Sequence, residues 1–177
     1  MINDGYWKQE LEKELKVFKK NKKHPFENKT AYWHRINRSL FYSAVIIRRM
    51  FEDDKEAEPY FKKHNRDMSS LALLQYKVNT IEYPIAKDEP FLLHKFIPEN
   101  YSFDDQKITE LKLNEICNQI IHSYTWSLAF FQDSGKVIGV LLSSDRQKKK
   151  TAYFLPLEEW IKAIEFCINK STIRKRR

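Results

Sequence analysis

Residues 113–144 read LNEICNQIIHSYTWSLAFFQDSGKVIGVLLSS, and they contain the change of pattern on which the fold prediction depends. Up to Ser123 the apolar residues recur at helical spacing, which places Leu113, Ile116 and Ile120 on one side of a helix. From Tyr124 onward large apolar residues alternate with small or polar ones, as is typical of a strand. Residues 133–135 supply a turn before a second strand over 136–144. The stretch therefore predicts a helix followed by an antiparallel hairpin.

The sequence that follows predicts one more strand and a final helix. A lysine-rich loop over 144–150 leads to a short strand over 151–155, and Pro156 suits the first position of a helix. Five apolar residues share one face of that helix: Leu157, Trp160, Ile161, Ile164 and Ile168. We expect the basic tail, residues 171–177, to be frayed.

The sequence that precedes the stretch predicts two amphipathic helices. The first covers 4–20 with one apolar stripe, formed by Trp7, Leu11, Leu15 and Phe18. The second runs from about Thr30 to Asp53 with a strongly apolar face, formed by Trp33, Ile36, Leu40, Ala44, Ile47, Met50 and Phe51. We expect this long apolar helix to lie at the centre of a bundle.

The middle of the chain has weaker patterns. Residues 52–67 are highly charged and predict a short helix or a loop, while 71–83 fit either a helix or a strand. Three prolines indicate an irregular connection through Asp105, after which the helix containing the opening stretch is expected to begin near Thr109.

The fold class predicted from these elements is mainly α, a helical bundle with a small antiparallel β-sheet near the C-terminus. It corresponds to one domain over 1–170, with the strands inserted at about 124–155 and the basic tail at 171–177. A parallel sheet is disfavoured because strands and helices do not alternate.

The composition restricts the function classes. The chain has 177 residues, enough for one domain with a substantial core. Its net charge of +8 indicates a polyanionic partner such as nucleic acid, and the alternative is a basic surface that is only solvated. Only three glycines are present, so glycine-rich phosphate loops are excluded. Cys117 and Cys167 lie in apolar stretches and are expected to be buried hydrophobes rather than a disulfide or a metal pair.

The sequence gives no indication of a cofactor, a metal or a membrane segment. The histidines are scattered without the spacing of metal ligands. The chain starts without a signal peptide pattern and has no long uncharged apolar run. We therefore expect a soluble cytoplasmic protein.

Polar residues gather on one side of the helix in the opening stretch, where Asn114, Asn118 and His122 are spaced one turn apart. The segment 117–122 resembles the signature helix of the HEPN superfamily, named for higher eukaryotes and prokaryotes nucleotide-binding. Its motif is an arginine, a small polar residue, a few variable residues and a histidine. Asn118 and His122 match this motif, whereas Cys117 occupies the position of the arginine.

The resemblance implies a helical, dimeric, metal-independent endoribonuclease, or a derivative of one, in a bacterial toxin–antitoxin or antiviral defence setting. His122 would act as the acid–base residue, and Asn118 would orient it or contact the ribose. Histidine changes its charge near neutral pH and can serve either role. The alternatives are a helix-terminal or core histidine with satisfied hydrogen bonds and an asparagine bonded only to local backbone.

Since Cys117 cannot supply a guanidinium, the phosphate-binding charge would have to come from elsewhere. Arg35 and Arg38 on the second helix are the candidates, with surface solvation or a salt bridge as the alternative. Weaker candidates for nucleic-acid contact are His34, Lys148, Lys149 and Lys150.

A second reading is a non-catalytic module that binds nucleic acid or protein, or an assembly subunit. The aromatic strand at 124–131 or the second helix would then form an oligomer interface. The expected partners are RNA or another nucleic acid and a second copy of the chain or a different protein.

Overall fold

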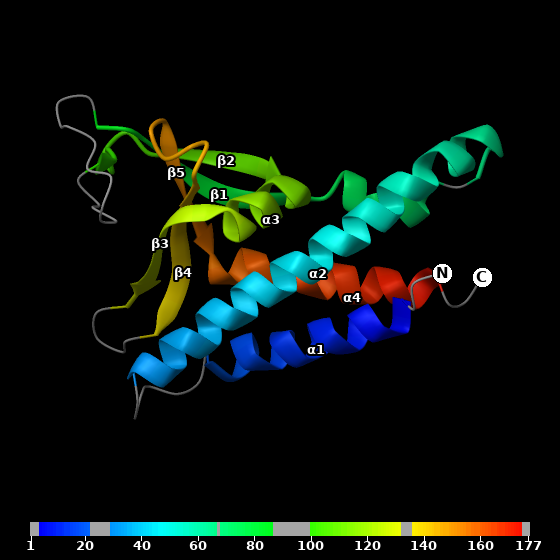
Figure 1. Ribbon diagram of the computed structural model, residues 1–177, viewed down its shortest axis with the longest axis horizontal. Coiled ribbons are helices and arrows are strands. Elements are labelled where there is room, and N and C mark those ends of the chain that lie inside the picture. The colour runs from blue at the N-terminus through cyan, green and yellow to red at the C-terminus, as the bar shows by residue number, and fades with distance from the viewer. Residues whose placement is uncertain (1–3, 22–28, 67, 87–99, 132–135, 175–177) are drawn as a thin grey trace.

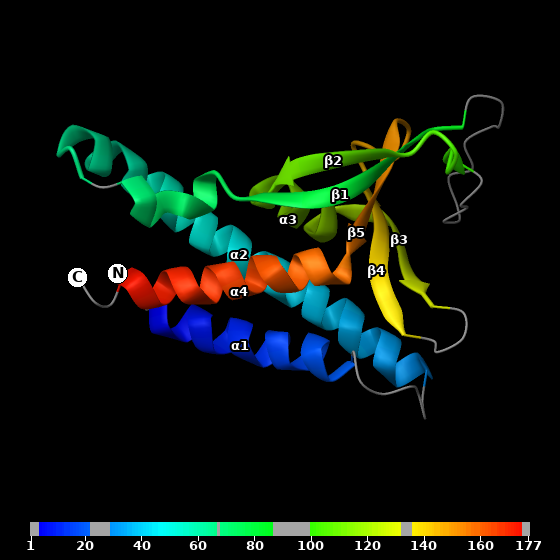
Figure 2. The same cartoon turned by 180° about the vertical axis from the view of Figure 1, so that it is seen from behind.

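A computed structural model describes residues 4–21, 29–66, 68–86, 100–131 and 136–174 (Figure 1). Within these residues three long helices form one layer, and a single antiparallel sheet packs against one end of it. The long helices are α1 (Asp4–Asn21), α2 (Lys29–Lys63) and α4 (Leu157–Arg174). In both views α1 and α4 lie alongside each other while α2 crosses them (Figures 1 and 2). None of the described helices combines the length and apolar character required to cross a membrane.

The sheet has five described strands in the order β2-β1-β5-β4-β3, and every neighbouring pair is antiparallel. The strands are β1 (Lys77–Pro84), β2 (Lys107–Lys112), β3 (Ser123–Phe130), β4 (Val137–Ser144) and β5 (Thr151–Pro156). A short helix, α3 (Leu113–Ile121), lies between the sheet and α2, and a 3-10 helix, η1 (Met68–Leu74), precedes β1. These contacts place α3 at the junction of the two layers (Figure 1).

The predicted helical bundle with a small C-terminal sheet is wrong. The sheet begins at β1 and is not confined to residues 124–155, because β1 and β2 from the middle of the chain join it. β1 pairs with β2 in a register that sets Val78 opposite Leu111 and Thr80 opposite Thr109. Strand β2 is mostly exposed and polar at the edge of the sheet, so it lacks the alternation that identifies half-buried strands. The rejection of a parallel sheet is confirmed.

Helix α2 is longer than predicted, because residues 52–63 continue it instead of forming a loop or a separate short helix. Ion pairs along the helix stabilise this charged part, with Arg49–Asp53 at 3.2 Å and Lys62–Glu58 at 2.7 Å. The predicted start of α3 near Thr109 is also wrong, since that residue lies in β2.

The other expected elements are confirmed, as are most of the expected core residues. Helix α1 and strands β3 to β5 occupy the predicted stretches, and the apolar face of α3 is buried. The last helix, α4, is also found, but it begins after Pro156 and continues to Arg174, so residues 171–174 of the tail that was expected to be frayed are helical. Trp160 is fully buried, and its indole N–H donates to Ser43 Oγ at 3.0 Å, which joins α4 to α2. Trp33 is an exception, because it is 43% exposed and packs beside the Phe130 ring.

Candidate functional site

The polar side of α3 forms one wall of a cleft of about 500 Å³. Its residues follow helical spacing, so their side chains share a face opposite the buried apolar one. They are Glu115, Asn118, Gln119 and His122. The remaining walls come from Arg48 of α2 and from residues 144–147, at the end of β4 and in the loop that follows. Three segments far apart in the sequence therefore meet around α3.

The backbone of His122 is fixed at the end of α3. Its N–H donates to the Asn118 carbonyl at 3.0 Å, and its own carbonyl accepts from the Asp145 N–H at 3.2 Å. The side chain is exposed and lines the cleft. The imidazole is thus carried on a well-anchored backbone while remaining accessible to a ligand.

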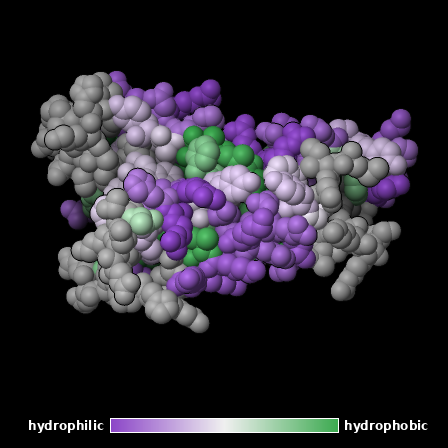
Figure 3. Space-filling view, turned by 60° about the horizontal axis from the view of Figure 1, so that its bottom comes forward, coloured by the Kyte–Doolittle hydropathy of each residue, from purple (hydrophilic) through white to green (hydrophobic). Residues whose placement is uncertain are grey.

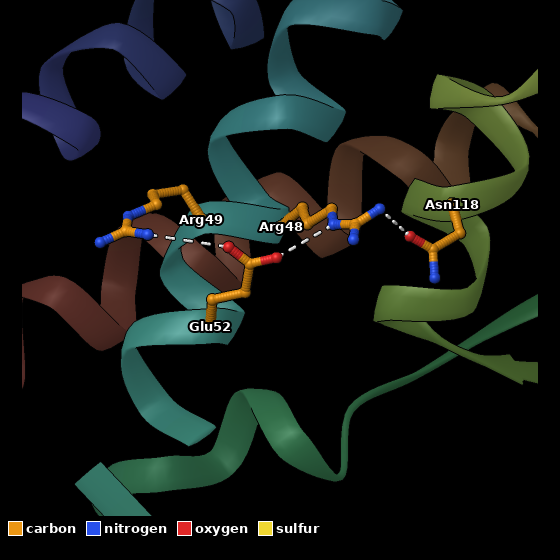
Figure 4. Close-up of polar contacts among 4 residues, drawn as sticks. All are labelled: Arg48, Arg49, Glu52 and Asn118. Carbon is orange, nitrogen blue, oxygen red and sulfur yellow. Dashed lines mark hydrogen bonds and ion pairs between the residues drawn. The ribbon is translucent and has the colours of Figure 1, made fainter. Parts of the chain in front are cut away.

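Arg48 reaches the polar face of α3 from α2 (Figure 4). Its Nη1 donates to Asn118 Oδ1 at 2.5 Å, and its Nε donates to Glu52 Oε1 at 3.2 Å. The second oxygen of Glu52 lies 3.7 Å from Arg49 Nη1, and Arg49 also pairs with Asp53. Arg48 is therefore held by an acceptor on each side, which fixes the orientation of its guanidinium at the cleft wall.

The loop after β4 is tied to α3 as well. The Ser144 N–H donates to Gln119 Oε1 at 2.8 Å. Asp145 is paired with Lys148 at 2.5 Å, and this hydrogen bond lowers the pKa of the Asp145 carboxyl. The Lys148 ammonium lies 3.6 Å from the centre of the Tyr124 ring. These contacts hold the loop, and with it Arg146, against the cleft.

The cleft combines cations with groups that can exchange protons. Arg48 and Arg146 supply guanidinium groups, while Glu115 and Asp145 supply carboxylates to the same cleft that His122 lines. One oxygen of Glu115 accepts from the Lys112 N–H at 2.9 Å, which anchors the side chain at the start of α3. A guanidinium suits a phosphate, and an imidazole and a carboxylate suit proton transfer.

Cys117 points away from the cleft and into the core. It is fully buried, and burial raises its pKa well above the ordinary value because a thiolate loses its hydration there. Burial likewise raises the pKa of Cys167 to about 12. Both cysteines are free, so the prediction that they are buried hydrophobes is confirmed. A thiol that stays protonated in the core does not act as a nucleophile.

The structure brings Asn118 and His122 together in the cleft but places the predicted arginines elsewhere. Arg35 and Arg38 are exposed on α2, and Arg38 is ten residues from Arg48, about 15 Å along the helix. Arg48 and Arg146 supply the guanidinium groups at the site, and neither was predicted from the sequence. For Arg48, the only local indication was its spacing of four residues from Glu52.

The weaker candidates are dispersed. His34 is exposed on α2, outside the cleft lining, and Lys149 and Lys150 are exposed in the loop after β4. Lys148 is engaged with Asp145 and Tyr124 beside the cleft. Asn114 faces a different cavity, at the other end of α3.

Among the described residues no three His, Cys, Asp or Glu side chains are grouped so as to hold a metal ion. No family model matches the chain, and it matches no curated protein and no solved structure either.

Proposed function

We propose that the cleft binds a phosphodiester of RNA and cleaves it without a metal ion. One observation carries the proposal: the Arg48 guanidinium is hydrogen-bonded to Asn118, one helical turn from His122, in the same cleft. This contact supplies the charge that Cys117 cannot provide. The sheet differs from the helical bundle that the HEPN resemblance implies, so the proposal rests on these residues and not on the family fold.

The reaction uses the ribose 2′-hydroxyl as an internal nucleophile. A base removes its proton, the oxygen attacks phosphorus, the bond to the 5′-oxygen breaks, and an acid protonates the departing oxygen. The products are a 2′,3′-cyclic phosphate and a free 5′-hydroxyl. In the cleft, Glu115 accepts the first proton and His122 donates the second, while Arg48 binds the non-bridging oxygens and stabilises their charge.

The test is incubation of the purified protein with RNA at low salt in the presence of EDTA, with the ends of the products determined. We expect cyclic phosphate and 5′-hydroxyl ends, and loss of cleavage in His122→Ala. His64→Ala is the matched control, because this histidine is also exposed but lies beyond the C-terminal end of α2, outside the cleft lining. Cleavage at an unchanged rate in His122→Ala would overturn the mechanism.

The same cations favour a second function, non-catalytic binding of nucleic acid. Arg48 and Arg146 line the cleft, and Lys149 and Lys150 are exposed nearby in the sequence. RNA binding that weakens as salt rises, without any cleavage by the wild-type protein, would assign this function instead.

A further inference from the structure

Arg146 is an unpaired cation in the wall of the cleft. It lies in the loop after β4, its side chain is exposed, and it lines the cleft together with the polar side of α3. Among the described residues, no hydrogen bond, ion pair or ring contact engages its guanidinium. All of its N–H groups are therefore available to a ligand. Arg48 differs, because it already donates to Glu52 and to Asn118.

The backbone around Arg146 is held in a fixed position. The Lys148 N–H donates to the Ser144 carbonyl at 2.9 Å, which closes a turn around Arg146. The Asp145 N–H donates to the His122 carbonyl at 3.2 Å, and the Asp145 carboxylate pairs with Lys148 instead of with Arg146. Arg146 is thus attached, through its neighbour in the chain, to the C-terminal end of α3.

Two side-chain amides of the cleft also present donors. Asn118 Oδ1 accepts from Arg48, and Gln119 Oε1 accepts from the Ser144 N–H. Neither donor can accept a hydrogen bond, so the oxygen of each amide must face its partner. The two NH₂ groups have no partner among the described residues. Together with Arg146, they favour a ligand that is rich in acceptor oxygens, such as a chain with successive phosphates.

The proposed reaction sets the direction of the RNA strand along α3. Glu115, which accepts the proton of the 2′-hydroxyl, lies in the first turn of α3, whereas His122, which protonates the 5′-oxygen, follows its last turn. The nucleotide with the attacking hydroxyl therefore lies toward Glu115, and the leaving nucleoside lies toward His122. The strand runs from 5′ to 3′ in the same direction as α3.

We propose that Arg146 forms a second phosphate subsite, which binds the phosphate on the 3′ side of the leaving nucleoside. Arg48 contacts α3 at Asn118, and the loop of Arg146 is attached at His122, one turn further on and about 6 Å along the axis. The two guanidinium groups thus follow one another in the direction of the strand. The fork of Arg146 suits two oxygens of this phosphate. The subsite rests on the proposed function, because the roles of Glu115 and His122 set the direction.

The experiment measures binding of 2′-O-methyl dinucleotides of one sequence by isothermal titration calorimetry at low salt. They carry no terminal phosphate, a 3′-phosphate or a 5′-phosphate, and the methyl group blocks the internal nucleophile. The two phosphorylated dinucleotides have the same charge, so comparing them removes the general attraction to a basic protein. We expect the wild-type protein to bind the 3′-phosphorylated one about tenfold more tightly than the 5′-phosphorylated one, as expected for one hydrogen bond between charged groups.

Arg146→Met should remove the preference for the 3′-phosphate and leave the affinity for the unphosphorylated dinucleotide unchanged. Its thermal midpoint should also be unchanged, because the side chain is exposed and makes no contact that stabilises the fold. Arg66→Met is the matched control and should keep the preference. Arg66 is likewise an exposed arginine, but it lies beyond the C-terminal end of α2 and outside the cleft lining.

The two proposals fail in different ways. Equal affinity of the wild-type protein for the two phosphorylated dinucleotides, or a preference that persists in Arg146→Met, overturns the subsite. His122-dependent cleavage of RNA would in either case leave the proposed function standing. An Arg146-dependent preference without any cleavage of RNA would support the subsite in a cleft that only binds. A wild-type protein that neither binds these dinucleotides nor cleaves RNA overturns both.

Discussion

The Arg48 guanidinium has its orientation fixed before any ligand arrives. Glu52 and Asn118 accept from its Nε and Nη1 at 3.2 and 2.5 Å, which leaves the remaining N–H groups of the fork for a ligand. Donors aligned in advance need no reorganisation when charge develops during a reaction. At the scale of single residues, we therefore expect cleavage of RNA to depend most strongly on His122 and next on Arg48.

Replacing Arg48 by lysine tests that dependence. Lysine keeps the positive charge but cannot reproduce the fork, so we expect single-turnover cleavage of RNA to slow by about 10²–10³-fold. The comparison is Arg49→Lys, because Arg49 pairs with Glu52 and Asp53 outside the cleft lining. Equal rates in the two variants would show that Arg48 does not hold the phosphate.

At the scale of elements, a buried ion pair joins α2 to α4. Asp54 is fully buried on the part of α2 that was predicted to be a short helix or a loop, and its carboxylate pairs with Lys170, which is 7% exposed. Neither charge can be left alone in the core without a large desolvation cost. The pair explains why the charged segment after Phe51 continues as helix instead of leaving the helical layer.

Asp54→Ala should lower the free energy of unfolding by about 3–5 kcal/mol, because Lys170 keeps a buried charge without its partner. Asp53→Ala provides the comparison, since it removes a partly exposed ion pair with Arg49 and should cost under about 1 kcal/mol. Denaturant unfolding measures both values. Removing Lys170 as well, in Asp54→Ala/Lys170→Met, should recover part of the loss, and a double variant as unstable as the single one would contradict this account.

At the scale of the whole molecule, nine large apolar side chains are exposed among the described residues. The face shown in Figure 3 is mostly hydrophilic, with small apolar patches near its middle. Phe41 and Val45 are 49% and 39% exposed, one turn apart on α2. The homodimer implied by the sequence resemblance remains a prediction. The sequence places its interface on the second helix or on the strand at 124–131, and Phe41 and Val45 are exposed on that helix.

A dimer would have twice the 21.4 kDa mass of the chain, which light scattering at tens of micromolar protein would detect. Phe41→Asp is then expected to yield the monomer, because a charge is costly to bury in an interface. Ile108→Asp is the control, since Ile108 is 86% exposed on β2, an edge strand of the sheet, and not on α2. A wild-type protein of monomeric mass would contradict the predicted dimer.

Features that depend on local periodicity can be read from the amino-acid sequence alone. Helices α1 and α4 and strands β3 to β5 follow from apolar spacing and turn residues within each segment. The common face of Asn118 and His122 follows in the same way, because they are separated by one turn of α3.

The fold class and the set of residues that form the site depend on contacts between segments that are distant in the sequence. Strand β2 shows little alternation and becomes recognisable through its pairing with β1, and α2 is extended where Asp54 meets Lys170, which is 116 residues away. Arg48 enters the cleft through a contact with Asn118, seventy residues further along the chain. The physical reason is the same for strand β2, helix α2 and Arg48. The free energy that stabilises each of them comes from contacts between distant segments, and such contacts leave no pattern in the local sequence.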